Sequence, residues 1–347
     1  MTPTEQLLFL DRATVTRCAA AIDPVEAVET VLRAHAAGRT ELPAEGYLPW
    51  ENSQGAYCRS IAMLGAVTGP RGAVHGMKLI NAAVSNPARG LDRAGGCGFL
   101  FDSETARPVV LAEAAYLSAL RTAAYTMSSV RHLGPAHFDS VTLIGCGAQA
   151  RAHAELLARY FPNVSRLHVH DSLPERATAF AAWVMERKLP FSVVAHERPD
   201  KASLASSVVV TVTVTDAGYL TADCFRPGSL VAHVSLDDLL PEVFDRAEAV
   251  YVDDVDLVRD NPRRVLGRLM CEGRVLPPGG SGHGRPLSGT LGAVLTGSVP
   301  AVRPGDGVVV SNPFGMAVLD VGLLSDVAAR AEEEGLGQRL DLIGAGR

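Results

Sequence analysis

The feature that most constrains the fold is a glycine-rich turn between an apolar run and a helical run at residues 141–157, VTLIGCGAQARAHAELL. Gly145 permits a tight turn, Gly147 lets backbone N–H groups approach a pyrophosphate, and Ala150 allows the helix to pack closely on the strand. The N-terminus of such a helix attracts phosphate. The pattern predicts a dinucleotide site, with a glycine turn of unrelated purpose as the alternative. The cofactor-binding residues in it are Gly145, Gly147, Ala148, Gln149 and Ala150.

The second strand of this unit, RLHVHD, ends in an acid that bears on the choice of cofactor. Asp171 is placed to accept hydrogen bonds from both ribose hydroxyls, and its charge repels a 2′-phosphate, so the sequence favours NAD. Arg176 could instead approach a phosphate, which leaves NADP as the less favoured cofactor. Thr211 and Thr213 lie near the end of a later strand, where they line the nicotinamide pocket or simply suit a strand.

From residue 139 onward, short apolar strands alternate with helices, which indicates a parallel sheet wrapped by helices. Before it lie a helix that starts after Asp23, several strand-like runs and a long helix at about 113–132. A last helix follows the segment SNPFG. We therefore predict an α/β protein. A doubly wound Rossmann domain occupies 131–305, and an α+β domain is built from both chain ends, 1–130 and 306–347.

Three cations lie within apolar sequence: Arg59 in YCRSIAML, Lys78 in GMKLI and Arg121 in SALRTAAY. A buried charge is costly unless it is paired. The carboxylate of an amino-acid substrate would be such a partner, since arginine holds carboxylates in a bidentate fork. The alternative is that each cation reaches solvent or meets a structural acid.

Two adjacent acids, Asp237 and Asp238, follow the predicted strand GSLVAHVS. They therefore lie at its carboxyl end, where open α/β sheets bind ligands. A carboxylate there could take a proton from a substrate amine, although one of the two could merely cap the next helix.

Composition excludes several classes of partner. The formal net charge is −6 and no basic stripe occurs, which argues against nucleic acid. No run approaches the length of a membrane span, and the N-terminal sequence does not resemble a signal peptide. The six cysteines are scattered, which argues against zinc and disulfides and favours a reducing cytoplasm. Cys146, in the glycine turn, is expected to pack rather than react.

Taken together, GMK, SALRTAA, IGCGAQARAH and PFGMAVLD resemble the ornithine cyclodeaminase/mu-crystallin family, over about Phe9 to Gly337. The resemblance implies a Rossmann domain plus a substrate-binding and dimerisation domain, and hence a homodimer. It implies carboxylate binding by Arg59, Lys78 and Arg121. It also assigns substrate contacts to Met63, Phe314 and Gly315, and a catalytic role to Lys78 and to an aspartate that is Asp237 or Asp238. The shorter alignment from the strand favours Asp237.

Within the family, RSIAM at 59–63 lacks the glutamate that ornithine and lysine cyclodeaminases carry there. The motifs look most like the N-(2-amino-2-carboxyethyl)-L-glutamate dehydrogenase branch, which makes 2,3-diaminopropionate for siderophores and peptide antibiotics. That branch tends to have Arg-Asp where this chain has Asp237-Asp238. The implied reaction is NAD-dependent oxidation at an amino-acid α-carbon, through an imine. The alternatives are a cyclodeaminase, an imine reductase or amino-acid dehydrogenase, and a non-catalytic binder of NAD(P)H and small ligands.

Overall fold

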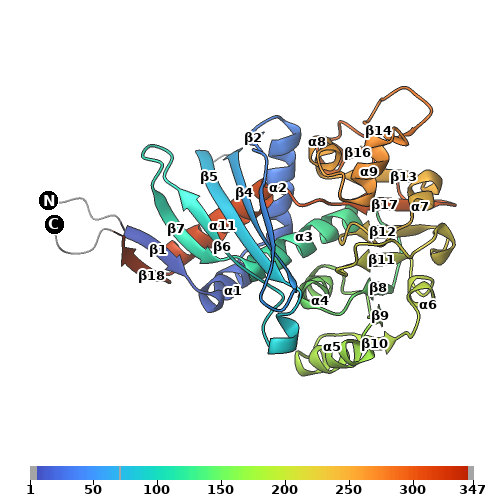
Figure 1. Ribbon diagram of the computed structural model, residues 1–347, viewed down its shortest axis with the longest axis horizontal. Coiled ribbons are helices and arrows are strands. Elements are labelled where there is room, and N and C mark those ends of the chain that lie inside the picture. The colour runs from blue at the N-terminus through green and yellow to red at the C-terminus, as the bar shows by residue number, and fades with distance from the viewer. Residues whose placement is uncertain (1–5, 70–71, 343–347) are drawn as a thin grey trace. The chain divides into compact units, whose positions relative to one another are not determined.

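Two sheets organise the chain, which is described here from a computed structural model for residues 6–69 and 72–342 (Figure 1). They belong to two units. One unit runs up to Arg121 and resumes at Met316, and the other is Thr122–Gly315. The predicted segments 1–130 and 306–347 include residues 1–5, 70–71 and 343–347, which lie outside the described residues.

In the first unit, the described residues form an eight-stranded sheet of order β18-β1-β7-β6-β5-β4-β2, with β3 also paired to β4. All pairs are antiparallel except β1 with β7. The strands are β1 (Gln6–Leu10), β2 (Thr40–Glu41), β3 (Gly46–Glu51), β4 (Tyr57–Gly69), β5 (Gly72–Ala83), β6 (Ala94–Phe101), β7 (Pro108–Glu113) and β18 (Gln338–Asp341). The helices are α1 (Arg12–Ala20), α2 (Pro24–Ala36), the short 3-10 helix η1 (Pro87–Arg89) and α11 (Ala317–Glu333).

Helix α2 begins where the sequence predicts. The carboxylate of Asp23 accepts hydrogen bonds from the backbone N–H groups of Val25 and Glu26, each at 3.0 Å, and Pro24 occupies the first turn. This satisfies donors that a helix start otherwise leaves unpaired.

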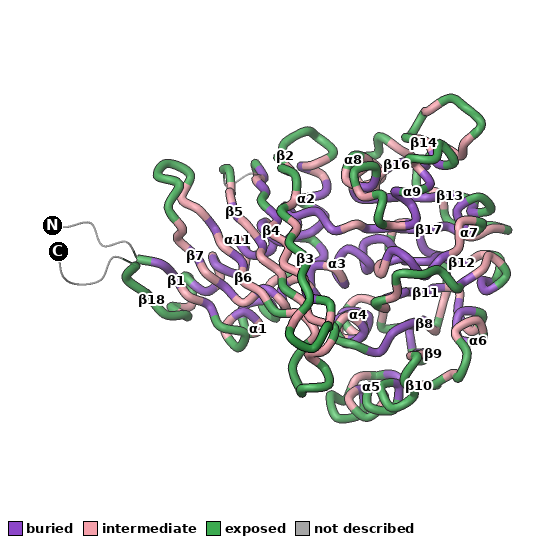
Figure 2. The backbone as a smooth tube through the Cα atoms, in the orientation of Figure 1, coloured by how far each residue is buried: buried purple, intermediate pink, exposed green. Residues whose placement is uncertain are grey.

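Helix α11 packs closely on the sheet because glycines face it. A Cβ atom added to these glycines would approach side chains of α11: Gly65 to 2.9 Å from Val318, Gly76 to 3.1 Å from Val321 and Gly98 to 2.9 Å from Leu324. The helix is accordingly largely buried, whereas β3 is largely exposed (Figure 2). The close packing brings polar side chains at the start of α11 within reach of the strands.

The second unit contains an eight-stranded parallel sheet of order β10-β9-β8-β11-β12-β17-β13-β16. Its strands are β8 (Ser140–Ile144), β9 (Arg166–His170), β10 (Ser192–Ala195), β11 (Val208–Thr211), β12 (Ser229–His233), β13 (Ala249–Val252), β16 (Gly289–Thr290) and β17 (Val308–Asn312), and a separate pair is β14 (Val275–Leu276) and β15 (Arg285–Pro286). Its helices are α4 (Ala148–Tyr160), α5 (Pro174–Glu186), α6 (Pro199–Ser203), η2 (Ala222–Cys224), α7 (Pro241–Arg246), α8 (Val255–Arg259), α9 (Val265–Cys271) and α10 (Leu291–Leu295), while α3 (Ala115–Leu133) crosses from one unit to the other.

The chain runs outward from β8 through β9 to β10, and then returns to β11 on the other side of β8. This confirms the predicted α/β fold with a doubly wound sheet. Ligands of such sheets bind where the strand order reverses, at the carboxyl ends of the strands, which here lies between β8 and β11.

The boundaries of the two units differ from the predicted domain boundaries, because the second unit runs from Thr122 to Gly315 rather than over 131–305. Strand β17 lies in the parallel sheet, between β12 and β13, although the sequence assigned residues 306–347 to the other domain. Val309 and Val310 are fully buried, as a central parallel strand requires. The assignment of NAD binding to 131–305, and of substrate binding and dimerisation to the chain ends, stays a prediction.

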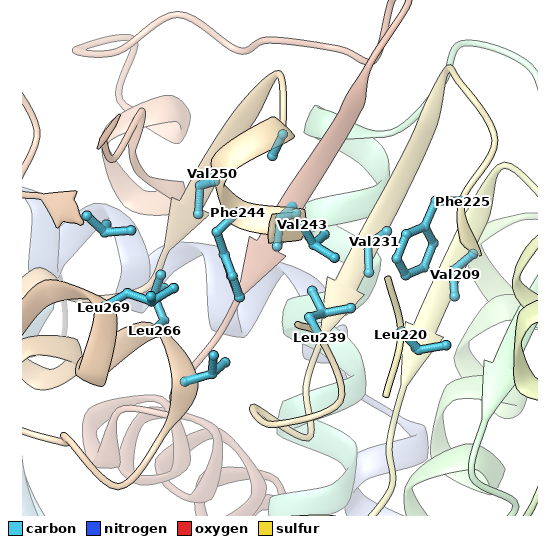
Figure 3. Close-up of a cluster of buried hydrophobic side chains, with 14 of the residues drawn as sticks. Val209, Leu220, Phe225, Val231, Leu239, Val243, Phe244, Val250, Leu266 and Leu269 are labelled. Carbon is cyan, nitrogen blue, oxygen red and sulfur yellow. The ribbon is translucent and has the colours of Figure 1, made fainter. Parts of the chain in front are cut away.

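A hydrophobic cluster supports the carboxyl half of the second unit. Val231 on β12 and Val250 on β13 pack with Phe244 of α7 and with Leu266 and Leu269 of α9 (Figure 3). This cluster fixes α9 against the sheet, and therefore also fixes the turn that precedes α9.

Candidate functional site

In the first unit, two of the three predicted cations meet one aspartate. Lys78 on β5 and Arg121 on α3 both contact Oδ2 of Asp320 on α11, with distances of 2.8 Å from Nζ and 2.9 Å from Nη2. Lys78 also donates to Oγ of Ser118 at 3.3 Å. All three charged side chains are buried.

The charges in this cluster do not balance, because two buried cations share one buried carboxylate. Burial lowers the pKa of Lys78, although Asp320 pulls it upward and the half-buried Glu45 adds a weaker attraction. Burial alone would raise the pKa of Asp320, but Arg121 and Lys78 hold it below its usual value. Nε of Arg121 is buried without a hydrogen-bond partner. An incoming carboxylate would supply both the missing charge and the missing acceptor.

Arg59 and Met63 lie on the same face of the sheet as Lys78. Met63 stands directly opposite Lys78 across the β4–β5 ladder, and Arg59 lies further along β4, opposite Ala82. Residues two apart on a strand share a face, as do residues directly opposite one another. Arg59 is half-buried, and its side chain makes no hydrogen bond or ion pair to another described residue. The structure thus places Arg59, Met63 and Lys78 on one face of the sheet.

In the second unit, Gly145 and Gly147 meet different demands. Gly145 has φ +101°, and a Cβ atom there would lie 2.8 Å from the carbonyl oxygen of Val212. Gly147 is the N-cap of α4, and a Cβ atom there would meet nothing within 4 Å. Ala148 and Gln149 begin α4, and Ala150 is fully buried. The turn therefore leaves open space at the helix N-terminus, which fits a phosphate group.

Asp171 lies against this glycine turn. Its Oδ2 accepts a hydrogen bond from the backbone N–H of Cys146 at 2.9 Å, and its Oδ1 accepts from Leu173 at 3.1 Å. Burial and then Asp171 raise the pKa of the Cys146 thiol to about 12, so this thiol stays protonated at neutral pH. Arg176, the residue considered for a 2′-phosphate, is exposed in the first turn of α5.

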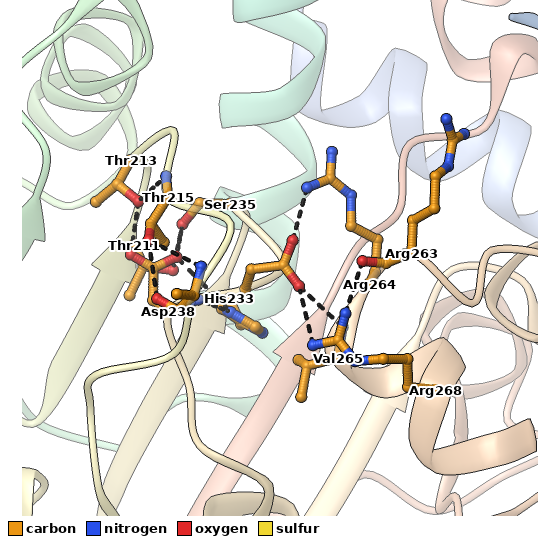
Figure 4. A network of polar contacts seen from close by, with 12 residues as sticks. Thr211, Thr213, Thr215, His233, Ser235, Asp238, Arg263, Arg264, Val265 and Arg268 are labelled. Carbon is orange, nitrogen blue, oxygen red and sulfur yellow. Dashed lines mark hydrogen bonds and ion pairs between the residues drawn. The ribbon is translucent and has the colours of Figure 1, made fainter. Parts of the chain in front are cut away.

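Asp238 lies at the centre of a hydroxyl network (Figure 4). Its carboxylate accepts hydrogen bonds from Thr213 at 2.7 Å, from Tyr219 at 2.8 Å and from Ser235, and Ser235 also lies 2.9 Å from Thr211. Burial and then Asp238 raise the pKa of Tyr219. Thr211 and Thr213 thus take part in a network around Asp238, and their contact with the cofactor stays a prediction.

His233 does not neutralise Asp238. Its Nε2 accepts a hydrogen bond from the backbone N–H of Asp238 at 3.1 Å, and its Nδ1 lies 2.7 Å from Oδ1 of Asn312. This pattern requires a neutral ring with its proton on Nδ1. Burial lowers the pKa of His233 accordingly.

Asp237 faces a different partner from Asp238. Its Oδ2 contacts Nη1 of Arg264 at 2.7 Å, and its Oδ1 accepts from the backbone N–H of Val265 at 2.9 Å. Arg268 approaches the same carboxylate at 3.8 Å. Asp237 is therefore paired with a cation, whereas the hydrogen bonds to the side chain of Asp238 come from hydroxyl groups.

Phe314 and Gly315 follow β17, and their backbone N–H groups donate to the buried carboxylate of Asp253 at 3.0 and 2.6 Å. Burial raises the pKa of Asp253, against the hydrogen bonds that it accepts. The two residues are held by Asp253, and their contact with a substrate stays a prediction.

Sequence reasoning missed partners that come from distant segments. No site role is assigned from the sequence to Asp320, Tyr219, Ser235 or Arg264. Tyr219 and Ser235 lie close in sequence to the predicted site residues Thr213 and Asp237. Their hydroxyl groups could therefore have been recognised as further hydrogen-bond donors at the site. Arg264 lies in a run of arginines, PRRVLGR, and nothing local connects it with Asp237.

Within residues 6–69 and 72–342, no group of three or more His, Cys, Asp or Glu side chains is arranged to hold a metal ion. None of the helices in those ranges combines the length and hydropathy needed to cross a bilayer.

Comparison with known proteins identifies relatives over the full length. The model of the ornithine cyclodeaminase/mu-crystallin family matches residues 6–335. N-((2S)-2-amino-2-carboxyethyl)-L-glutamate dehydrogenase of Staphylococcus aureus is 28% identical, over 97% of this chain and 99% of that protein. The crystal structure of CmnK is 66% identical with a TM-score of 0.93, and the match covers 99% of this chain and 100% of that one.

An archaeal alanine dehydrogenase, solved as a dimer with bound NAD, matches at 22% identity with a TM-score of 0.80, over 97% of this chain and 99% of that one. This likeness shows the fold alone. The resemblance carried by the motifs is confirmed by the family match, which spans both units. The chain belongs to the ornithine cyclodeaminase/mu-crystallin family.

Proposed function

We propose that the protein oxidises N-(2-amino-2-carboxyethyl)-L-glutamate at the α-carbon of the glutamate moiety, with NAD as hydride acceptor. The amine nitrogen loses a proton and the α-carbon loses a hydride, which forms a carbon–nitrogen double bond. Water then adds to this imine, and cleavage gives 2-oxoglutarate and 2,3-diaminopropionate. The observation that carries the proposal is the buried pair Lys78 and Arg121, which share the single carboxylate of Asp320. The Staphylococcus aureus relative supports the choice of substrate.

Lys78 and Arg121 bind the α-carboxylate in this proposal. Nε of Arg121 is buried without a partner, so a ligand oxygen there would form a charge-assisted hydrogen bond. Arg59, on the same face of the sheet, adds a further cation. Binding of the α-carboxylate by these cations orients the α-carbon for reaction.

Asp238, rather than Asp237, is our proposed base. Asp237 is neutralised by Arg264, whereas Asp238 is surrounded by hydroxyl groups and a neutral imidazole. An uncompensated carboxylate stabilises the positive charge of an iminium group. Asp238 is fully buried, so the amine proton reaches it through Tyr219 or Thr213, which are more exposed.

The glycine turn of the second unit holds the NAD pyrophosphate, and the residues there fit this role. Gly147 leaves open space at the start of α4, and Asp171 places a carboxylate against the turn, which disfavours the 2′-phosphate of NADP. The alanine dehydrogenase with the same fold binds NAD.

The proposal is tested by adding N-(2-amino-2-carboxyethyl)-L-glutamate and NAD to the purified protein. NADH should form, and mass spectrometry should detect 2-oxoglutarate and 2,3-diaminopropionate in equal amounts. Asp238→Asn should lower kcat by a factor of about 10² to 10⁴. Absence of NADH would overturn the proposal. Ammonia with proline or pipecolate from ornithine or lysine would indicate a cyclodeaminase instead, and NADH oxidation with cyclic imines a reductase.

We also propose that a second copy of the chain covers part of the first unit. Leu48 is 64% exposed on β3 and Leu64 is 44% exposed on β4, so apolar side chains lie open at this edge. Exposed apolar patches often mark interfaces. Light scattering should show a dimer, and Leu64→Glu should shift it toward a monomer, while a monomeric wild-type chain would contradict this.

We also propose that the protein is located in the cytoplasm. All six cysteines are free, including the buried Cys18 and Cys58. Free thiols suit a reducing compartment, where 2,3-diaminopropionate would be supplied to the assembly of siderophores or peptide antibiotics. Fractionation of producing cells would place the protein.

A further inference from the structure

We propose that Arg264, positioned by Asp237, binds a second carboxylate of the substrate and so selects for an acidic side chain. This inference rests on the proposed function, in which the network of Asp238 accepts the proton of the substrate amine. It assigns Arg264 as a specificity-determining residue and Asp237 as a positioning residue.

The turn that carries Arg264 is fixed by several contacts. Arg264 is the N-cap of α9, and its neighbour Val265 donates its backbone N–H to Asp237 at 2.9 Å. The backbone N–H of Arg264 donates to the carbonyl of Asn261 at 3.1 Å. Arg268 donates from Nη1 to the carbonyl of Arg263 at 2.8 Å. A rigid turn presents its side chain in one place, which is what selective recognition requires.

The ion pair is buried at one end and open at the other. The side chain of Asp237 is 2% exposed, whereas that of Arg264 is 29% exposed. The carboxylate contacts Nη1 of a guanidinium that has five N–H donors in a planar fork. Asp237 therefore fixes the guanidinium of Arg264 at its buried end, while another part of the guanidinium remains accessible to a ligand.

The local charge also favours an anion. Arg264 and Arg268 both approach the single carboxylate of Asp237, so the three side chains carry an excess of positive charge. By contrast, Arg274 pairs with Asp245 at 2.6 Å, and both side chains are exposed to solvent, where an ion pair contributes little. A substrate carboxylate would complete the charge balance at Arg264, and Arg274 is an exposed arginine for comparison.

Asp237 and Asp238 are consecutive, so the cation and the hydroxyl network lie near each other in the second unit. Figure 4 shows Asp238 with Thr213 and Ser235 on one side, and Arg264 with Arg268 on the other. If the network of Asp238 takes the proton of the substrate amine, the guanidinium of Arg264 would lie near one of the two substituents of that amine.

Binding selectivity tests this inference independently of turnover. L-Glutamate and L-glutamine differ in one terminal carboxylate, and calorimetry with the NAD-loaded protein gives a Kd for each. Wild type should bind glutamate at least about tenfold more tightly than glutamine, and Arg264→Gln should remove this preference. An equal preference in wild type and Arg264→Gln, or none in wild type, overturns the inference. Failure of the proposed function appears separately, as absence of NADH from the N-substituted glutamate.

Further variants separate binding from folding. Arg264→Lys keeps the charge and should keep part of the preference, and Asp237→Asn should lose most of it because Arg264 is released. In turnover, Arg264→Gln should raise KM for the N-substituted glutamate by about ten- to a hundredfold with kcat within about threefold. Arg274→Gln is the matched control and should behave as wild type. Equal changes in the Arg274 and Arg264 variants would also overturn the inference.

Discussion

Lys78 and Asp320 form a buried ion pair of 2.8 Å between segments that are 242 residues apart. Arg121 contacts the same oxygen of Asp320, so the pair is part of an arrangement with more positive than negative charge. Removal of the acid should therefore affect both the stability of the first unit and its response to anions.

Asp320→Asn should reduce the free energy of unfolding by about 3–5 kcal/mol, because it leaves Lys78 and Arg121 without a buried counter-charge. Added L-glutamate should restore more stability in this variant than in wild type. Urea denaturation with and without glutamate measures both effects. Glu333→Gln is the control on α11, since its pair with Arg330 is largely exposed, and it should cost less than about 0.5 kcal/mol. A variant as stable as wild type would contradict the electrostatic role of Asp320.

The two glycines of the turn should respond differently to valine. Gly147→Val should leave the melting temperature within about 2 °C of wild type, since its side chain enters open space, and should weaken NADH binding about tenfold or more. Gly145→Val should lower stability by about 2 kcal/mol or more, because φ is +101° and the carbonyl of Val212 lies close. Thermal melts and fluorescence titration with NADH distinguish them. Unchanged NADH binding in Gly147→Val would place the phosphates elsewhere.

Asp171 should decide between the two nicotinamide cofactors. Asp171→Asn keeps an acceptor for the N–H of Cys146 but removes the charge that repels a 2′-phosphate. The ratio of NADPH to NADH affinity should rise about tenfold. Titration with both cofactors measures it, and Glu175→Gln, in the first turn of α5, is the control. An unchanged ratio would argue that Asp171 lies away from the ribose.

His153 should make stability depend on pH. It is fully buried, with Nε2 2.9 Å from Thr126, and burial lowers its pKa from 6.5 to about 4. Between these two values the unfolded chain binds the proton and the folded chain does not, so stability is complete above 6.5 and falls as the pH drops toward about 4. At about pH 5, wild type should have lost about 2 kcal/mol more than His153→Gln does. Parallel urea curves at about pH 7 and pH 5 check this, and identical losses would refute it.

Local patterns predicted the elements well. The turn at Gly145, the cap at Asp23 and the alternation of strands and helices follow from short-range rules, and each is present in the structure. The cations were identified because a charge inside an apolar strand needs a partner. The structure supplies one such partner, Asp320, for both Lys78 and Arg121. Two cations with one acid leave room for a second anion.

The remaining site could not be predicted because it depends on contacts between distant segments. Strand β17 joins the parallel sheet although residues 296–307, which precede it, form no helix or strand, so the predicted boundary fell before it. The register of Asp237 and Asp238 was ambiguous for a similar reason. Only the positions of Arg264 and Tyr219 show that one acid meets a cation and the other a hydroxyl group.

The separation of Lys78 and Asp320 by 242 residues sets the point in translation at which the two buried cations can acquire their shared counter-charge. Gly65, Gly76 and Gly98 admit a helix that contains Asp320, and the ribosome adds that residue long after Lys78. Domains generally fold as units during synthesis, from the N-terminus onward. A nascent chain can therefore complete the turn at Gly145 while its two cations still lack their acid. A product terminated before Asp320 would lack the acid that Lys78 and Arg121 share, so the proposed binding of a carboxylate there would require translation to have passed this residue.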